Sequence, residues 1–362
     1  MEEKRRIAWL DIARAFAIVA VVICHAVEAD YYFIRTGALL ATSFHWYYEN
    51  ILFTVGRLGV PVFLMITGAL MLCREYDIKS FYKRYLLPLF LTTEIWTVIN
   101  YFYNCARLSS PISVKALLGN ILFLKQSPLS HMWYMPMILG MYLVIPFVAK
   151  ALKGVPFQNI RLPLAVGFTV FSLVPLYNAF AGNVISQLPS AQILVGVGFL
   201  GGLYGVIMVM GYYIVNEKIL SRCPVWALVF VMAVSFAANT ALARYFFNNK
   251  LFHTDIFGWY TSPFIIVVAI CLFELLHRLR IERCNKAVSL ISRGSFGIYL
   301  THNLLLSFVN PLLKKIPAFI EANVVLQTAT RFAIGFIIPV IFIWIADKLT
   351  FTRAKKLLLF MK

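Results

Sequence analysis

The stretch Leu10-Asp11-Ile12-Ala13-Arg14, followed by an almost unbroken apolar run and then Cys24-His25, decides how this chain folds. A helix needs about 20 predominantly apolar residues to cross about 30 Å of hydrocarbon, and this run is long enough. At about 100° per residue, the steps from Arg14 to His25 end about 20° past three full turns. Asp11, Arg14 and His25 are therefore predicted to share one helix face. Charged groups inside a bilayer are costly and usually face a cavity or a partner, so this face predicts a functional site.

The composition extends this picture to the whole chain. Hydrophobic residues make up 61% of the 362 residues and charged residues 13%, at a mean hydropathy of +0.81, whereas ordinary globular chains carry about 25% charged residues. We predict an all-α, polytopic integral membrane helical bundle that forms a single domain over residues 1–362, with no appended soluble domain. Its ten predicted transmembrane spans are 7–27, 46–72, 83–104, 131–149, 162–180, 196–215, 225–243, 259–277, 294–312 and 325–347.

The net charge of +18 reflects membrane topology rather than a nucleic-acid partner. If both termini of a ten-span chain lie on one side, 22 of the 33 Lys and Arg fall in segments on that side, eight on the opposite side and three within spans. Basic residues concentrate in cytoplasmic loops, which places both termini in the cytoplasm. We therefore expect a multi-pass protein in contact with anionic lipids. The six cysteines are scattered without a CxxC pair, and nothing in them indicates a metal site.

The residues of the first helix allow two interpretations. Asp11 stands three residues before Arg14 and can form an ion pair with it that is purely structural. A lone histidine near a membrane interface, such as His25, is also more often structural. The functional interpretation is favoured because Asp11 and Arg14 are buried on the same face, where each charge must be paired or solvated in a cavity.

Arg57 is the charged residue of the second predicted span. It lies between Gly56 and Gly59 and close to Pro61, residues that allow close backbone approach and a local break in the helix. Two roles are open for it. Arg57 either binds substrate or serves as the counter-ion of Glu94, which lies in the middle of the third span.

Basic and aromatic residues stand at the starts of the third and fourth predicted spans. Lys83 and Arg84 lie at the cytoplasmic start of the third, where they suit phosphate groups or act only as positive-inside anchors. Trp133 and Tyr134 open the fourth span at the outer interface. Aromatic residues concentrate at such interfaces in any case, and a platform for stacking a sugar is the second interpretation.

Four motifs in this order resemble the membrane acyltransferase family 3, a group of ten-helix integral membrane proteins. The first is the spacing of Asp11, Arg14 and His25. The other three are Arg57-Leu58-Gly59-Val60-Pro61-Val62-Phe63 followed by Thr67-Gly68, His131-Met132-Trp133-Tyr134 with Tyr142 and Pro146, and Ser295-Phe296-Gly297-Ile298-Tyr299-Leu300-Thr301-His302. In the last motif, Tyr299 and His302 are three residues apart and so are neighbours on one helix face.

The resemblance implies transfer of an acyl group, most often acetyl, from a cytoplasmic acyl-CoA such as acetyl-CoA to a hydroxyl of an extracytoplasmic glycan, lipid-linked sugar or other envelope molecule. It implies that His25 is catalytic, as general base or acyl carrier, that Arg14 supports it, and that the location is a bacterial cytoplasmic membrane. We expect Asp11 to hold Arg14 in place. Contacts with CoA are expected from Lys83 and Arg84, which stand adjacent where many relatives have Arg-x-Arg, and contacts with substrate from Arg57, Glu94, Trp133, Tyr134, Tyr299 and His302.

A transporter or flippase for an envelope lipid or a small solute is the alternative function. Ten helices with buried ionisable groups fit that class equally well on composition. Transporters usually show two related halves, however, and no internal repeat is evident in this chain. The sequence identifies neither the acceptor nor an oligomeric state.

Overall fold

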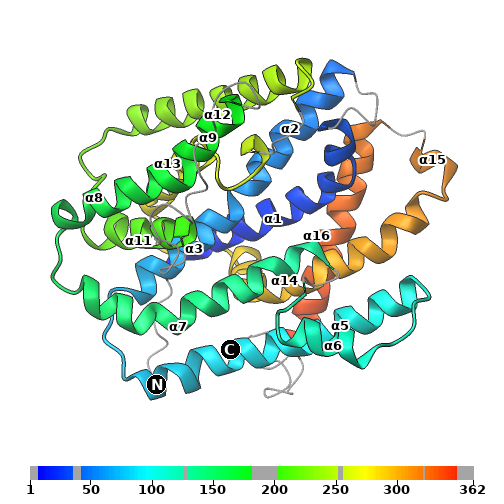
Figure 1. Ribbon diagram of the computed structural model, residues 1–362, viewed down its shortest axis with the longest axis horizontal. Helices are drawn as coiled ribbons and strands as arrows, with labels where there is room; N and C mark the ends of the chain where they lie inside the picture. Colours follow the sequence, from blue (N-terminus) through cyan, green and yellow to red (C-terminus); the bar gives the residue numbers. More distant parts are fainter. Residues whose placement is uncertain are drawn as a thin grey trace. The chain divides into compact units, whose positions relative to one another are not determined.

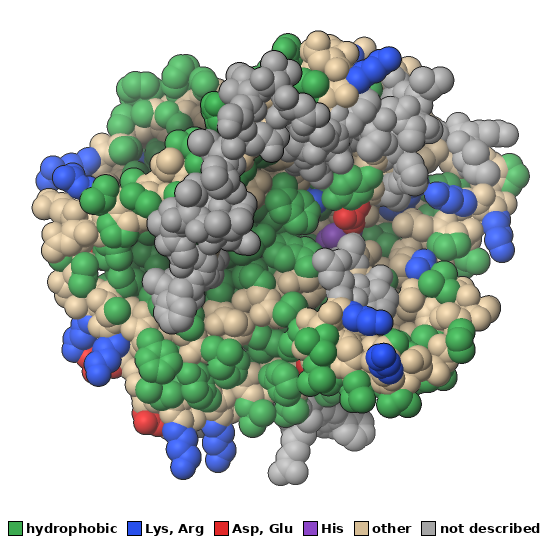
Figure 2. Space-filling model, viewed as in Figure 1, with side chains coloured by type: hydrophobic (Ala, Val, Ile, Leu, Met, Phe, Trp, Pro, Cys, Tyr) green, Lys and Arg blue, Asp and Glu red, His purple; other side chains and the backbone are tan. Residues whose placement is uncertain are grey.

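The computed structural model describes residues 7–35, 42–125, 129–181, 202–251, 256–320 and 323–348, and these residues form helices and connecting turns without a β-strand (Figure 1). Eight helical segments are long and apolar enough to cross a membrane, namely Ala8–Glu28, Ser43–Met71, His131–Leu152, Phe157–Ala181, Val225–Asn248, Ile256–His277, Lys286–Leu313 and Val324–Lys348. Hydrophobic side chains make up much of the described surface on the side drawn in Figure 2. The predicted all-α, polytopic membrane fold is confirmed.

Two of the ten predicted spans are not among these eight. The third corresponds to α5 (Leu87–Arg107), a helix of 21 residues whose buried face is partly polar. The sixth corresponds to α11 (Gly202–Asn216), a shorter apolar helix, and residues 196–201 of that predicted span lie outside the described residues. Polar residues on the buried face of α5, which lower its mean hydropathy, are Thr92, Thr93, Thr97 and Asn100.

Contacts group the chain into two compact units, of which the first comprises Met1–Arg74 and Val148–Ser292. Within it, α1 (Ala8–Arg35) packs against α2 (Ser43–Arg57) and α3 (Gly59–Met71), while α11 packs along α3. The last long helix of this unit, α13 (Pro263–His277), contacts α1, α3 and α11. The remaining elements of this unit are α8 (Phe157–Phe168), η3 (Thr169–Leu173), α9 (Val174–Ala181), α12 (Val225–Asn248) and η5 (Ile256–Gly258).

The second predicted span is divided in the structure. Its helix ends at Arg57 and resumes at Gly59, with Leu58 between the two parts. The break agrees with the expectation from Gly56, Gly59 and Pro61, since proline is tolerated in the first turn of a helix but not in its interior. It makes Arg57 the last residue of α2.

Two glycines bring the backbones of α3 and α11 into direct contact. A Cβ atom added at Gly68 would overlap the carbonyl oxygen of Met208, and one added at Gly211 would overlap the backbone of Met65. Small residues at helix interfaces allow this close approach in membrane proteins. No larger side chain fits at either position without moving one of the helices.

The second unit comprises Glu75–Phe147 and Arg293–Lys362. Its long helices are α5, α7 (Tyr134–Leu152), α14 (Lys286–Leu313) and α16 (Val324–Lys348), with the end of α7 and the start of α14 assigned to the first unit. The Ser307 hydroxyl donates a 3.0 Å hydrogen bond to the Tyr103 hydroxyl, linking α14 to α5. Shorter elements are α4 (Ile78–Phe81), η1 (Tyr82–Leu86), α6 (Val114–Ile121), η2 (Ser130–Trp133) and α15 (Pro317–Ile320).

Candidate functional site

Helix α1 carries the three residues that were predicted to share one face, and it runs without interruption from Ala8 to Arg35. Asp11 is buried, and its Oδ1 accepts a 2.7 Å hydrogen bond from the Ser292 hydroxyl. Arg14 Nη1 lies 3.8 Å from the same oxygen, which confirms the predicted ion pair. The Arg14 side chain is 30% exposed, against 5% for Asp11. The buried carboxylate thus holds one side of the Arg14 guanidinium, while the arginine side chain stays partly accessible.

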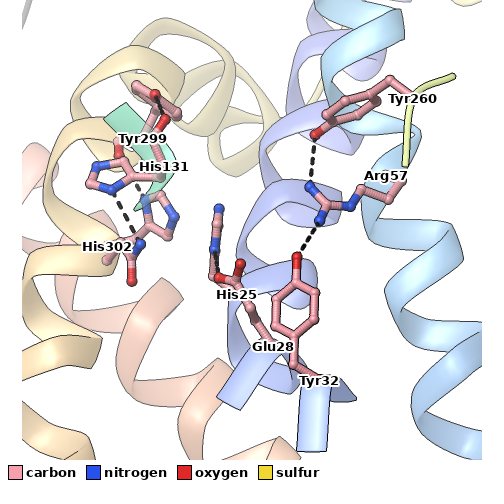
Figure 3. A network of polar contacts seen from close by, with 9 residues as sticks. His25, Glu28, Tyr32, Arg57, His131, Tyr260, Tyr299 and His302 are labelled. Carbon is pink, nitrogen blue, oxygen red and sulfur yellow. Dashed lines mark hydrogen bonds and ion pairs between the residues drawn. The ribbon is translucent and has the colours of Figure 1, made fainter. Parts of the chain in front are cut away.

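His25 forms a short contact that the sequence analysis did not predict. Its Nδ1 lies 2.5 Å from Oε2 of Glu28, one turn further along α1 (Figure 3). The His25 side chain is 9% exposed and that of Glu28 is 20% exposed. Glu28 follows His25 by three residues, the spacing at which side chains meet on a helix. That spacing was the signal available in the sequence.

The contact with Glu28 determines which nitrogen of the His25 ring carries the hydrogen. An ionised carboxylate can only accept hydrogen bonds, so we infer that Nδ1 of His25 carries the hydrogen and donates it to Glu28. In the neutral ring the other nitrogen, Nε2, then holds a lone pair. A carboxylate in this position orients the ring and fixes its tautomer. His25 is thereby arranged as a proton acceptor at Nε2.

Arg57 is enclosed by aromatic side chains of the first unit. It is 2% exposed, and its Nη1 and Nη2 donate hydrogen bonds of 3.4 and 3.2 Å to the hydroxyls of Tyr260 and Tyr32 (Figure 3). The guanidinium carbon lies 4.4 Å from the ring centroids of both Phe53 and Trp259. Cation–π contacts of a desolvated arginine contribute about 2 kcal/mol, which offsets part of the several kcal/mol that burial of an ion costs. Glu94, considered above as a counter-ion, belongs to the second unit.

His25 and Arg57 lie level with each other on adjacent helices. A Cβ atom added at Gly56 would lie 2.6 Å from Cys24 Cβ and 2.7 Å from the Cys24 backbone, so α1 and α2 touch where Cys24 meets Gly56. The residues that follow each of these in sequence are His25 and Arg57. Glycine at position 56 is therefore required for the approach that brings the two functional candidates to the same level.

In the second unit, the predicted substrate-binding residues Tyr299 and His302 form a buried cluster with His131. His302 Nδ1 lies 2.7 Å from the carbonyl oxygen of Tyr299, and because a carbonyl only accepts, Nδ1 carries the hydrogen. The Tyr299 hydroxyl donates a 2.5 Å hydrogen bond to the carbonyl of His131. The rings of His131 and His302 are 5.1 Å apart between centroids (Figure 3). His131 belongs to the motif His131-Met132-Trp133-Tyr134 but is not among the predicted site residues.

The aromatic residues at the start of α7 belong to the same cluster. The Tyr134 ring packs edge-on against that of Tyr299, with centroids 5.7 Å apart, and Trp133 packs edge-on against Tyr134 at 6.1 Å. Both are partly exposed. Trp133, Tyr134, Tyr299 and His302 thus form one cluster within the second unit.

The remaining predicted site residues of the second unit are Glu94, Lys83 and Arg84. Glu94 lies on α5, and neither of its buried carboxylate oxygens has a hydrogen-bond partner among the described residues. Lys83 and Arg84 are exposed in the η1 turn before α5. Just before that turn, the carboxylate of Asp77 accepts a 2.8 Å hydrogen bond from the Ser80 backbone. This hydrogen bonding to Ser80 lowers the pKa of the Asp77 carboxyl, so the group stays charged.

The comparison with known protein families decides what class of protein carries this geometry. The sequence matches the acyltransferase domain of acyltransferase family 3 over residues 7–348. The chain belongs to this family. The match covers both units of this acyltransferase and every predicted site residue. Searches of curated proteins and of solved structures found no match. Family membership favours an acyltransferase over the transporter considered above.

Proposed function

We propose that this acyltransferase moves an acetyl or related acyl group from a cytoplasmic acyl-CoA, such as acetyl-CoA, to a hydroxyl of an extracytoplasmic glycan, lipid-linked sugar or other envelope molecule. The observation that carries the proposal is the 2.5 Å contact between His25 and Glu28, on the first helix of a chain that belongs to an acyltransferase family. It supplies what acyl transfer to a hydroxyl needs, a histidine held with one nitrogen ready to accept a proton. The bacterial cytoplasmic membrane is the proposed location.

In the proposed reaction, Nε2 of His25 takes the proton of the acceptor hydroxyl as its oxygen attacks the thioester carbonyl carbon. The tetrahedral intermediate then releases CoA by cleavage of the carbon–sulfur bond, and the imidazolium returns the proton to the leaving thiolate. Glu28 stabilises the positive charge on the ring between these two steps. General-base catalysis of this kind contributes typically about 10²–10⁴-fold. In a second route, Nε2 attacks the thioester itself and carries the acyl group to the acceptor.

The other residues of the α1 stripe fit the donor side of the reaction. With both termini in the cytoplasm, Arg14 lies about 16 Å from His25 along the helix axis, toward the cytoplasm. Held by Asp11, it would orient the acyl-CoA or stabilise negative charge that develops during transfer. The exposed cations Lys83 and Arg84 suit the CoA phosphates. Residues proposed for contact with the acceptor are Glu94, Trp133, Tyr134, Tyr299 and His302.

The test is acyl transfer by the purified full-length protein in lipid nanodiscs, supplied with radiolabelled acetyl-CoA and an envelope glycan extract. We expect His25→Asn to remain folded and to lose transfer by about 10²–10⁴-fold, because no other group takes over as base. A matched control is His45→Asn, which removes the histidine of another His–Glu pair of the same unit, at 3.3 Å from Glu49, and should retain transfer. Transfer at the wild-type rate by folded His25→Asn protein would refute the mechanism.

Two further measurements complete the assignment. Acid quenching during a single turnover traps label on the protein if the acyl group passes through His25, and traps none if transfer is direct. Mass spectrometry of envelope glycans from a strain lacking the protein should show the loss of one acyl mass from the natural acceptor. Unchanged glycans and lipid-linked sugars would remove the envelope acceptor from the proposal.

A further inference from the structure

The first unit contains a buried positive charge that has no carboxylate partner among the described residues. Arg57 is 2% exposed, and its hydrogen bonds go to the hydroxyls of Tyr32 and Tyr260. Its Nε has no hydrogen-bond partner among the described residues, and none of them forms an ion pair with it. Phenols and ring faces soften the charge but do not neutralise it. A guanidinium in these surroundings therefore attracts an anion more strongly than it would in water.

The surroundings of Arg57 also connect it to the proposed reaction centre. Tyr32 follows His25 by seven residues, which places both on one face of α1, and Glu28 lies between them on that face. The contact of Gly56 with Cys24 sets Arg57 level with His25. The His25–Glu28 pair and Tyr32 thus share one face of α1, and Arg57 of α2 is hydrogen-bonded to Tyr32.

We propose that Arg57 binds an oxyanion, a carboxylate or a phosphate, that is part of a substrate and is held beside His25. Guanidinium groups pair with such anions through parallel N–H···O bonds, and Nε supplies a donor for them. The surrounding rings of Phe53 and Trp259 limit access of water to this pair. The inference rests on the proposed function only in saying where the anion comes from.

Two sources would present this chemistry at His25. The acyl group itself carries a carboxylate if the donor is a dicarboxylic acyl thioester, such as succinyl-CoA. Otherwise the acceptor carries it, as an acidic or phosphorylated sugar. In either case a neutral acetyl group transferred to a neutral sugar would leave Arg57 without its ligand.

Binding is tested first, without any turnover. Trp259 lies 4.4 Å from the guanidinium carbon, so its fluorescence reports on an anion that binds there. We expect succinate and inorganic phosphate to change the fluorescence of the wild-type protein, and the change to disappear in Trp259→Phe. In Arg57→Lys, which keeps the charge but loses the planar fork, the apparent dissociation constant should rise about 10-fold. The matched control is Arg244→Gln, because Arg244 also lies 5.0 Å over a tryptophan ring, that of Trp46, at the end of another helix. It should bind both anions as the wild type does.

Kinetics then identify the source of the anion. The first comparison varies the donor: succinyl-CoA, which is acidic in its acyl group, against acetyl-CoA, with methyl glucoside as the acceptor. The second varies the acceptor: acidic methyl glucuronide against neutral methyl glucoside, with acetyl-CoA as the donor. Arg57→Lys should raise KM for the acidic member of one pair by about 10–100-fold and leave its neutral partner unchanged. An equal loss of kcat in all three reactions would overturn the proposal. So would unchanged KM values together with unchanged fluorescence titrations in folded Arg57→Lys. If no donor supports transfer but succinate still binds through Arg57, the acyl-transfer proposal fails and the anion site stands.

Discussion

Two His–Glu pairs, one on α13 beside the start of α1 and one on α1 itself, differ in what the carboxylate does. At the start of the helix, the Trp9 ring packs edge-on against His277, with centroids 5.1 Å apart. His277 Nδ1 lies 3.4 Å from Glu274, but the shorter bond of that carboxylate, 2.6 Å, comes from Nε of Arg278. Near the other end, the 2.5 Å contact of Glu28 is with His25 itself.

The difference indicates that the Glu274 pair has a structural role. Arg278 also donates to the carbonyls of Leu220 and Cys223, at 2.6 and 2.8 Å, so Glu274 completes an anchor that holds the 218–223 turn to α13. His277 adds only a longer contact with Glu274. In the His25–Glu28 pair the 2.5 Å contact of the carboxylate goes to the histidine itself, the arrangement that the proposed base requires. Four substitutions test this contrast.

The largest effect is expected from Arg278→Ala. This change leaves the Glu274 carboxylate buried without its main partner and frees two backbone carbonyls. Because Arg278 is partly exposed, we expect a loss of about 3 kcal/mol in the free energy of unfolding, at the lower end for a broken buried pair. Unfolding in denaturant measures the loss, with exposed Arg280→Ala as the control. Acyl transfer per folded molecule should be unchanged, and a specific loss of kcat would mean that this end of α1 takes part in the reaction.

Glu28→Gln should act on the rate rather than on stability. The amide keeps the shape of the side chain but no longer stabilises the imidazolium, so kcat should fall about 10–100-fold, as for other groups that orient a functional histidine. This corresponds to about 1.4–2.7 kcal/mol in activation free energy. Glu274→Gln is the comparison, and should reduce stability while leaving kcat unchanged. The same fall in kcat for both variants would erase the distinction between the pairs.

Gly56→Ala tests whether the His25 pair depends on the close approach of α1 and α2. The added Cβ would stand 2.6 Å from Cys24 Cβ, and overpacking of this kind costs about 1–3 kcal/mol. The better helix propensity of alanine returns up to about 1 kcal/mol, so a net loss of about 1–2 kcal/mol is expected, together with lower kcat. Gly140→Ala is the control, since nothing lies within 4 Å of a Cβ at that position. It should leave activity intact.

The smallest effect is expected from His277→Gln. Glu274 retains its bond to Arg278, and the lost contact with His277 is long, so the stability change should stay within about 0.5 kcal/mol. Thermal unfolding and acyl transfer should both match the wild type. A loss as large as that of Arg278→Ala would show that the histidine is an equal member of the anchor.

The sequence predicted the contents of single helices well. The face shared by Asp11, Arg14 and His25 follows from helical periodicity, and the break before Gly59 from its glycines and proline. Glu28 was within reach of the same reasoning, because it follows His25 at the spacing that had been applied to Asp11 and Arg14.

Partners from distant parts of the chain were beyond such reasoning. Ser292 reaches Asp11 across 281 positions of sequence, and Tyr260 reaches Arg57 across 203. No periodicity relates residues so far apart, since only the packing of helices brings them together. For the same reason the pairing of His131 with His302 could not be foreseen, although each was recognised within its own motif.

The backbone contact between α3 and α11 has a mechanical consequence. Helices separated by layers of side chains can slide a little as rotamers adjust, but Gly68 and Gly211 seat each helix directly on the main chain of the other. Sliding would drive the next larger side chain of each helix into a carbonyl group. This pair therefore behaves as a rigid strut beside α1, and any opening that admits substrates is expected to use other helices as its moving parts.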